Sequence, residues 1–158
     1  MTLTLDQPSG YALVSFLPET ALPESLSQSL PDEMAQDDLV IRKLGVKAWG
    51  RLDYFRRFYS QAWGDRGTGG PLSPRAVQGL RRFLEACGDC LSSLQRKPSL
   101  FLTDDGLLEL CWEDLSGKAI QLVFRPTEVE YFIEQRHVEG CAAYQPDSLR
   151  KLAAILSI

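Results

Sequence analysis

The sequence predicts an α+β domain in which an antiparallel meander of four strands is covered on one face by helices. Residues 73–94 carry an apolar stripe at helical spacing, and residues 99–134 alternate apolar and polar side chains in short runs. Short connections join those runs, which makes consecutive strands antiparallel neighbours with one buried and one wet face. We expect an N-terminal strand and a basic, aromatic helix to complete the fold.

The helix predicted over residues 73–94 has a clear start and one apolar face. Ser73 is a favourable N-cap residue, and Pro74 suits the first helical position. The apolar residues that follow are spaced three or four apart: Val77, Leu80, Leu84, Cys87, Leu91 and Leu94. A helix with this stripe is expected to cover the apolar face of the sheet along its whole length.

Each predicted strand alternates its apolar residues toward one face. After a strand at 99–103, the turn at Asp104-Asp105-Gly106 is typical of a hairpin. The inward sets are Leu108, Leu110 and Trp112, then Ile120, Leu122 and Phe124, then Val129, Tyr131 and Ile133. The stretch with His137, Glu139 and Gly140 is predicted to be a polar connection to a last helix at about 146–156.

The first part of the chain is less regular. Residues 11–17 (YALVSFL) read as a strand, and residues 18–39 are rich in proline and acidic residues. From about residue 38 to 63 the pattern is helical, with an aromatic stripe of Ala48, Trp49, Leu52, Phe55, Tyr59 and Trp63. Gly45 and Gly50 weaken this helix, so the sequence is compatible with either one helix or two in this segment.

Charge is segregated along the chain, which we treat as one domain over residues 1–158. Residues 1–40 contain seven acidic residues and no Lys or Arg, residues 41–98 contain twelve basic and four acidic residues, and residues 99–158 contain five basic and ten acidic residues. One interpretation is that the acidic flanks fold over the basic middle and neutralise it. The other is an exposed basic face that meets an acidic partner.

The composition predicts a cytoplasmic protein. A chain of 158 residues suits one domain with its own core. No apolar run approaches the roughly 20 residues of a membrane span, and the first residues lack the pattern of a secretory signal. The chain has four cysteines and no such signal, which favours free thiols in a reducing compartment.

Candidate chemical groups are few, so the sequence favours a protein that is not an enzyme and that holds no metal and no cofactor. The pair Cys87-Gly-Asp-Cys90 lies in the middle of the predicted helix, away from the turns that carry zinc knuckles. His137 is the single histidine, and no orienting partner is evident for it. The glycines of residues 64–70 are not followed by the Lys-Ser/Thr of a phosphate-binding loop.

A resemblance covers about residues 60–135. It is carried by Trp63-Gly-Asp65, the glycine loop, Pro71-Leu-Ser-Pro74 before a long helix, Pro98, Asp105-Gly106 and Leu110-Cys-Trp112. This order resembles a broad set of uncharacterised small bacterial α+β proteins with a Trp-Asp-Gly-like loop, a Pro-x-Ser-Pro helix start and a β-meander. The resemblance implies an accessory protein of a mobile or defence-type locus, without established catalytic residues.

The predicted function is therefore a non-catalytic module that binds and modulates a protein partner, such as an antitoxin-like accessory protein of a bacterial defence locus. The alternative is a nucleic-acid-binding accessory protein that uses the basic helix at residues 42–66, because bases interleaved with aromatic rings suit both roles. The predicted contact residues are Arg51, Tyr54, Arg57, Phe58 and Arg66, with Phe132 on the acidic wet face of the meander as a second site of opposite charge.

Overall fold

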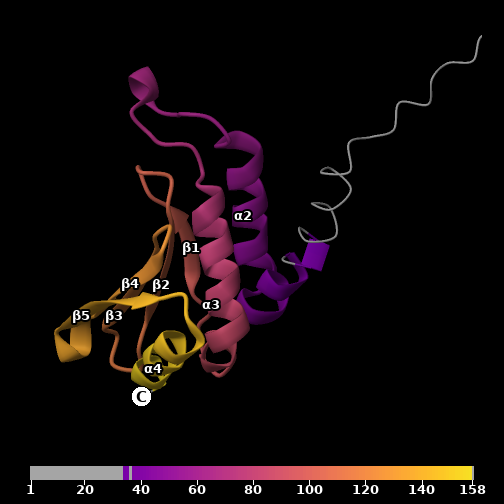
Figure 1. The fold of residues 1–158 in the computed structure, drawn as a ribbon. Helices are drawn as coiled ribbons and strands as arrows, with labels where there is room; N and C mark the ends of the chain where they lie inside the picture. The colour runs from indigo at the N-terminus through magenta and orange to yellow at the C-terminus, as the bar shows by residue number, and fades with distance from the viewer. Residues whose placement is uncertain (1–33, 36, 158) are drawn as a thin grey trace, which may run out of the picture.

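The computed structural model describes residues 34–35 and 37–157, and the predicted strand at 11–17 lies outside them. The helices are α2 (Val46–Phe58), α3 (Pro74–Ser92) and α4 (Pro146–Leu156), with 3-10 turns η1 (Asp65–Gly67) and η2 (Glu134–Arg136). The strands are β1 (Ser99–Leu102), β2 (Leu108–Glu113), β3 (Ala119–Phe124), β4 (Glu128–Ile133) and β5 (Val138–Ala143). Figure 1 shows a twisted sheet with α3 and α4 on one face and α2 toward the β1 edge.

The sheet is antiparallel throughout, with its strands in the order β1-β2-β3-β4-β5, so the predicted α+β class is confirmed. The prediction of four strands was wrong. The stretch after η2 was expected to be a polar connection, yet it pairs with β4 over six residues, from Ile133↔Val138 to Glu128↔Ala143. Its apolar signal is weak because β5 is an edge strand that buries only Ala142 fully.

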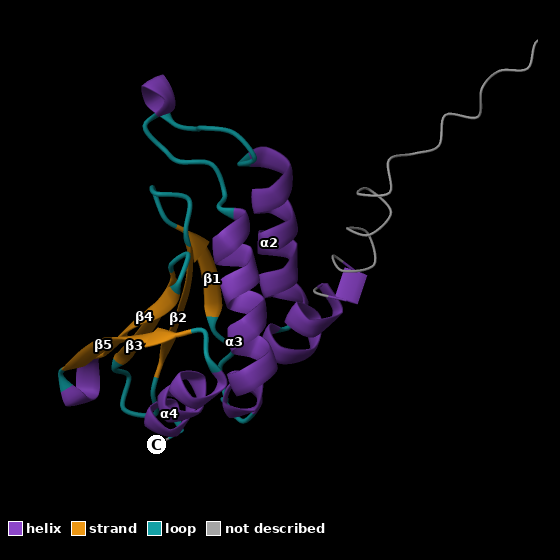
Figure 2. Ribbon diagram, in the orientation of Figure 1, coloured by secondary structure: helices purple, strands orange, loops and turns teal. Residues whose placement is uncertain are grey.

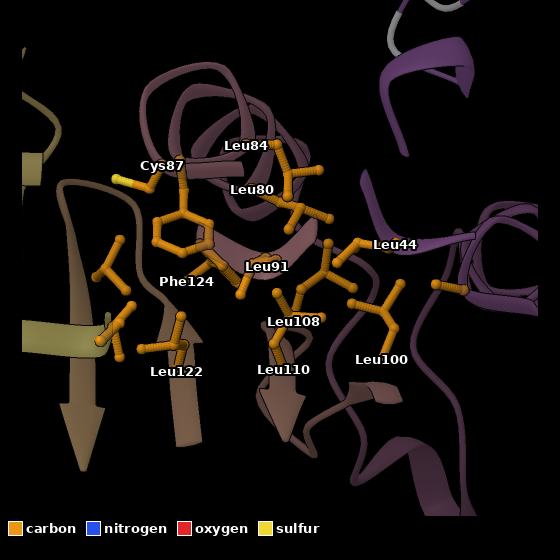
Figure 3. Close-up of a cluster of buried hydrophobic side chains, with 14 of the residues drawn as sticks. Leu44, Leu80, Leu84, Cys87, Leu91, Leu100, Leu108, Leu110, Leu122 and Phe124 are labelled. Carbon is orange, nitrogen blue, oxygen red and sulfur yellow. The ribbon is translucent and has the colours of Figure 1, made fainter. Parts of the chain in front are cut away.

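The core lies between α3 and the inner face of the sheet. The alternation predicted for the strands is confirmed for eight of its nine inward residues, which are buried: Leu108, Leu110, Trp112, Ile120, Leu122, Phe124, Val129 and Ile133. The ninth, Tyr131, is half-buried and packs against this core. Phe83 of α3 meets Phe124 of β3 with their ring centroids 5.6 Å apart. Figure 3 shows Leu80, Leu84 and Leu91 of α3 turned toward Leu108 and Leu110 of β2. The helix begins as predicted, because the Ala76 backbone N–H donates to Ser73 Oγ at 3.3 Å.

Between residue 37 and α3, the described chain contains two α-helical stretches rather than one. Residues 37–44 are helical, Gly45 interrupts with a φ of 91°, and α2 then ends at Phe58. A positive φ of this kind is favourable only for glycine, so Gly45 provides the break. The predicted helical stripe is therefore wrong at its end, because Trp63 lies in the following loop.

The loop between α2 and α3 is anchored to the β1–β2 hairpin. The Leu72 N–H donates to Tyr59 O, the Gly70 N–H to Asp104 O and the Ser73 N–H to Gly106 O. Gly106 has a φ of 78°, and a Cβ there would lie 2.0 Å from Pro71 O. The hairpin turn therefore needs glycine both for its conformation and for the close approach of the loop.

α4 closes the inner face toward β5. Its Leu149, Leu152 and Leu156 are buried, as predicted, and the helix packs on α3 and β5. Figure 2 shows α2, α3 and α4 all on the same side of the sheet, which leaves the opposite face without a helix among the described residues. No helix within residues 37–157 has the length and apolar content to cross a membrane.

The loss of a phenylalanine should destabilise the protein much more on the inner face of the sheet than on the outer face. Phe124→Ala should lower the free energy of unfolding by about 3–5 kcal/mol, because it opens a cavity under α3. Phe132→Ala, on the opposite face, should cost less than about 1 kcal/mol. Urea denaturation of both variants measures the difference. Equal losses would contradict this assignment of the faces.

Candidate partner-binding surface

α2 exposes one row of residues while its other side is buried. Ala48 and Leu52 are buried, whereas Val46, Gly50, Tyr54 and Phe58 are four residues apart and share the outer face. Val46 and Phe58 are each 66% exposed, and Tyr54 is 49% exposed. A Cβ at Gly50 would have no neighbour within 4 Å. The outer face is thus an apolar row with an open gap at Gly50.

An aromatic groove adjoins this row at the junction of α2 and β1. Its volume is about 340 Å³, and its lining is Arg51, Tyr54, Phe55, Tyr59, Trp63, Phe101 and Leu102. The ring centroids of Tyr54 and Phe58 are 4.7 Å apart, and those of Tyr59 and Trp63 are 5.1 Å apart in an edge-on arrangement. Electrostatic interaction with Tyr54 raises the pKa of the Tyr59 phenol above its usual value.

Trp63 is held in the groove by the loop that carries it. Its Nε1–H donates to Gly70 O at 2.7 Å, and its backbone pairs with Gly69 as an isolated bridge. A Cβ at Gly69 would lie 2.4 Å from the indole ring, so the ring packs flat on that glycine. The ring therefore forms a fixed wall of the groove, although Trp63 lies in a loop and not in the helix that the sequence predicted.

Arg51 joins the helix to the edge of the sheet. Its Nη1 donates to Leu100 O at 2.9 Å, and its guanidinium carbon lies 4.9 Å from the centroid of the Phe101 ring. The first contact covers a backbone carbonyl of edge strand β1, and the second is a cation–π contact. Arg51 thus holds together the two elements that form the groove.

The structure brings together three of the six predicted contact residues. Arg51, Tyr54 and Phe58 meet at the outer face of α2, and with Phe101 we call them the α2–β1 surface. Arg57 is exposed and paired with Asp53 one turn earlier. Arg66 is exposed in η1, with a left-handed φ of 62°, in the loop that projects past the end of α2 (Figure 1).

Phe132 belongs to a different surface. It lies on the outer face of the sheet beside Gln121 and Glu139, in line with its predicted alternation. Glu109 on this face accepts hydrogen bonds from Gln121 Nε2 and from the Cys111 thiol. Arg125 pairs with Glu130, and Lys118 pairs with Glu134. The carboxylates here are therefore largely engaged with neighbours in the same chain.

Sequence reasoning missed Phe101. The ring is 41% exposed because it alternates outward between the inward side chains of Leu100 and Leu102. The only signal for Phe101 in the sequence is that an apolar residue stands at an outward position of the predicted strand. What the sequence did not show is that α2 lies beside β1 and makes this ring part of the same surface.

Most cations of residues 42–57 are paired within the chain. Arg42 pairs with Asp38, Arg56 with Asp37, Arg57 with Asp53 and Lys43 with Asp89. Two of these carboxylates come from the acidic first part of the chain. The interpretation in which acidic flanks neutralise the basic middle therefore applies to Asp37 and Asp38, and the α2–β1 surface is more aromatic than basic.

The cysteines do not converge. Cys87 is buried and donates to Leu149 O, whereas Cys111 lies on the outer face of the sheet. Burial raises the pKa of both thiols to about 12. Among the described residues no group of three or more His, Cys, Asp and Glu side chains is arranged to hold a metal ion. His137 is exposed at the turn before β5.

A larger hollow of about 560 Å³ lies at the other end of the fold, between the last turns of α3 and α4 and the β2–β3 turn. Trp112, Asp114 and Leu156 are among the residues that line it. Trp112 Nε1 and Asp114 Oδ2 are buried without a hydrogen-bond partner among the described residues. None of the predicted contact residues lies in this hollow.

Comparison with known proteins finds no matching protein-family model, no matching curated protein and no matching solved structure. The resemblance to small bacterial accessory proteins therefore stays a prediction.

The thiols are expected to differ in reactivity. With iodoacetamide at pH 8, Cys141 should be alkylated first because it is exposed. Cys87 should react only after unfolding, because burial and a raised pKa keep it protonated and out of reach. Peptide mass spectrometry over time measures both rates. Labelling of Cys87 in the native protein at the rate of Cys141 would contradict the packing of α3.

Proposed function

We propose that this chain is a non-catalytic cytoplasmic module that binds and modulates a protein partner through the α2–β1 surface. The observation that supports it best is the row of exposed apolar residues on α2 next to an aromatic groove. Contiguous exposed apolar side chains on a folded domain mark interaction sites more often than isolated ones do. Aromatic and arginine side chains are also the residues that anchor protein interfaces.

The shape of the surface suggests how a partner is held. The gap at Gly50 lets a partner backbone approach α2 closely, and the groove beside Tyr54 accepts an apolar side chain. A helix that lays an apolar stripe along Val46, Tyr54 and Phe58 satisfies both features. As an accessory or antitoxin-like protein, the chain would modulate its partner by covering the apolar stripe of the partner's helix.

Nucleic-acid binding by residues 42–66 is the alternative. The aromatic rings support it, since exposed rings can stack on bases. The pairing of Arg42, Arg56, Arg57 and Lys43 with carboxylates weakens it, because phosphates would have to displace those partners. We therefore favour a protein partner and treat nucleic acid as an outcome of the salt experiment below.

The variant Tyr54→Ser/Phe58→Ser tests the proposal. Partner capture from the native host should fall by about 30-fold, as expected when the two side chains together contribute about 2 kcal/mol to binding. Thermal stability should change little, because both side chains are exposed. The matched control is Leu115→Ser, which removes a 92% exposed apolar side chain on the β2–β3 turn. Quantitative mass spectrometry of the captured protein measures both.

Two results would contradict this assignment. If the double variant captures the partner as well as Leu115→Ser does, the α2–β1 surface is not the site. If Phe132→Ala alone abolishes capture, the acidic sheet face is the interface. Arg51→Glu is a poor probe, because it also removes the hydrogen bond to Leu100 O and should destabilise the β1 edge.

Salt separates the two classes of partner. Binding to an apolar protein stripe should change little between 50 and 300 mM NaCl, whereas binding to phosphates weakens steeply. Isothermal titration with the captured partner, and fluorescence anisotropy with a labelled single-stranded oligonucleotide, measure the two dependences. A steep decrease in oligonucleotide binding that is also lost in Tyr54→Ser/Phe58→Ser would favour the nucleic-acid function.

A further inference from the structure

The two edges of the sheet differ in how their backbone groups are covered. On the β1 edge, α2 lies alongside and Arg51 donates to Leu100 O. On the β5 edge, no strand lies beyond Val138–Ala143 among the described residues. Exposed backbone groups on a sheet edge are a template for pairing with another strand. The open β5 edge is thus a potential interaction surface on the side of the sheet away from β1.

The hydrogen-bond alternation shows which groups of β5 face outward. In an antiparallel pair, each residue bonds to one neighbouring strand, and the next residue bonds to the other. Arg125 N donates to Glu128 O at the start of the β3–β4 ladder. Because the pattern repeats every two residues, the backbone N–H and C=O groups of Glu130 also point toward β3. The backbone groups of the next residue, Tyr131, therefore point toward β5. Its partner there is Gly140.

It follows that Gly140 and Ala142 bond to β4, whereas Glu139 and Cys141 direct their N–H and C=O groups away from the sheet. These four groups have no backbone or side-chain hydrogen bond among the described residues. Both residues are exposed. Lysine, proline or a bulge commonly protects a sheet edge, and β5 has none of these. Glu139 is its only charged residue.

We propose that two copies of this chain pair antiparallel through β5, with Gly140 on the two-fold axis. In this register Glu139 of each copy lies opposite Cys141 of the other. Each such pair exchanges both of its N–H···O bonds, so all four free groups on each edge are satisfied. The two sheets become one continuous sheet.

The β5 sequence is self-complementary in this register. Glu139 meets a small neutral side chain instead of a second carboxylate, which avoids the cost of like charges placed directly opposite. Val138, which is 36% exposed, meets Ala142 on the inner face, and the axis passes a residue without a side chain. A register centred on Cys141 would instead use the Ala143 carbonyl, which already accepts from the Gln145 N–H.

The test is sedimentation velocity of the full chain over a range of concentrations, with a reducing agent present so that no disulfide joins Cys141 residues. The wild-type protein should shift from monomer to dimer as its concentration rises. Cys141→Pro should remain monomeric, because proline removes an outward N–H without breaking the ladder to β4. Cys141→Ser keeps that N–H and should dimerise like the wild type.

Charge at position 141 tests the register and does not depend on the proline variant folding. Cys141→Lys places a cation opposite Glu139 of the other copy and should tighten the dimer about 2- to 30-fold, from two symmetric cross-strand ion pairs. Cys141→Glu should weaken it by a similar factor. If Cys141→Lys weakens the dimer, the two lysines face each other and the Gly140 register is wrong.

Three results would overturn the proposal. The first is a wild-type chain that stays monomeric at every concentration. The second is a folded Cys141→Pro variant that dimerises as the wild type does. The third is a dimer that is lost in Tyr54→Ser/Phe58→Ser but kept in Cys141→Pro. The last result would place self-association on the α2–β1 surface. Circular dichroism and melting temperature confirm that each variant is folded.

Discussion

The packing of α3 on the inner face of the sheet is the interaction on which the rest of the structure depends. The strands present one apolar face, and the stripe of α3 covers its centre through contacts such as Phe83 with Phe124. Burial of apolar surface is the main favourable term in folding, so this contact determines which side of the sheet is inside. It also leaves α2 free to lie at the β1 edge.

The position of α2 explains why one helix can be both structural and available for binding. Its Ala48 and Leu52 are buried, and Arg51 satisfies an edge carbonyl, so the helix is fixed on two sides. The exposed row with Tyr54 and Phe58 makes its ring contacts with neighbouring aromatic residues of α2 and with Tyr59 at its end, and its outer side faces solvent. Because the nearby cations are paired with carboxylates, what the surface offers to a partner is mainly apolar area and ring faces.

The two proposed interaction surfaces are at opposite edges of one sheet. α2 lies against β1, whereas the free backbone groups of Glu139 and Cys141 are on β5, four strands away in the sheet order. Pairing through β5 would therefore leave both α2–β1 surfaces exposed in a dimer, with one near each end of the joined sheet. A dimer of this kind could hold two partner chains at once without competition between the two contacts.

The sequence by itself determined the α3 helix, the inward faces of β2, β3 and β4, and the outward position of Phe132, because periodicity records burial directly. It could not identify β5, since an edge strand of small residues buries too little to leave an alternating pattern. It also could not show that Phe101 and Arg51 meet Tyr54, or that Trp63 leaves the helix. Those contacts depend on how α2 and its loop dock on β1, and only the tertiary structure brings together residues that the chain separates by about fifty positions.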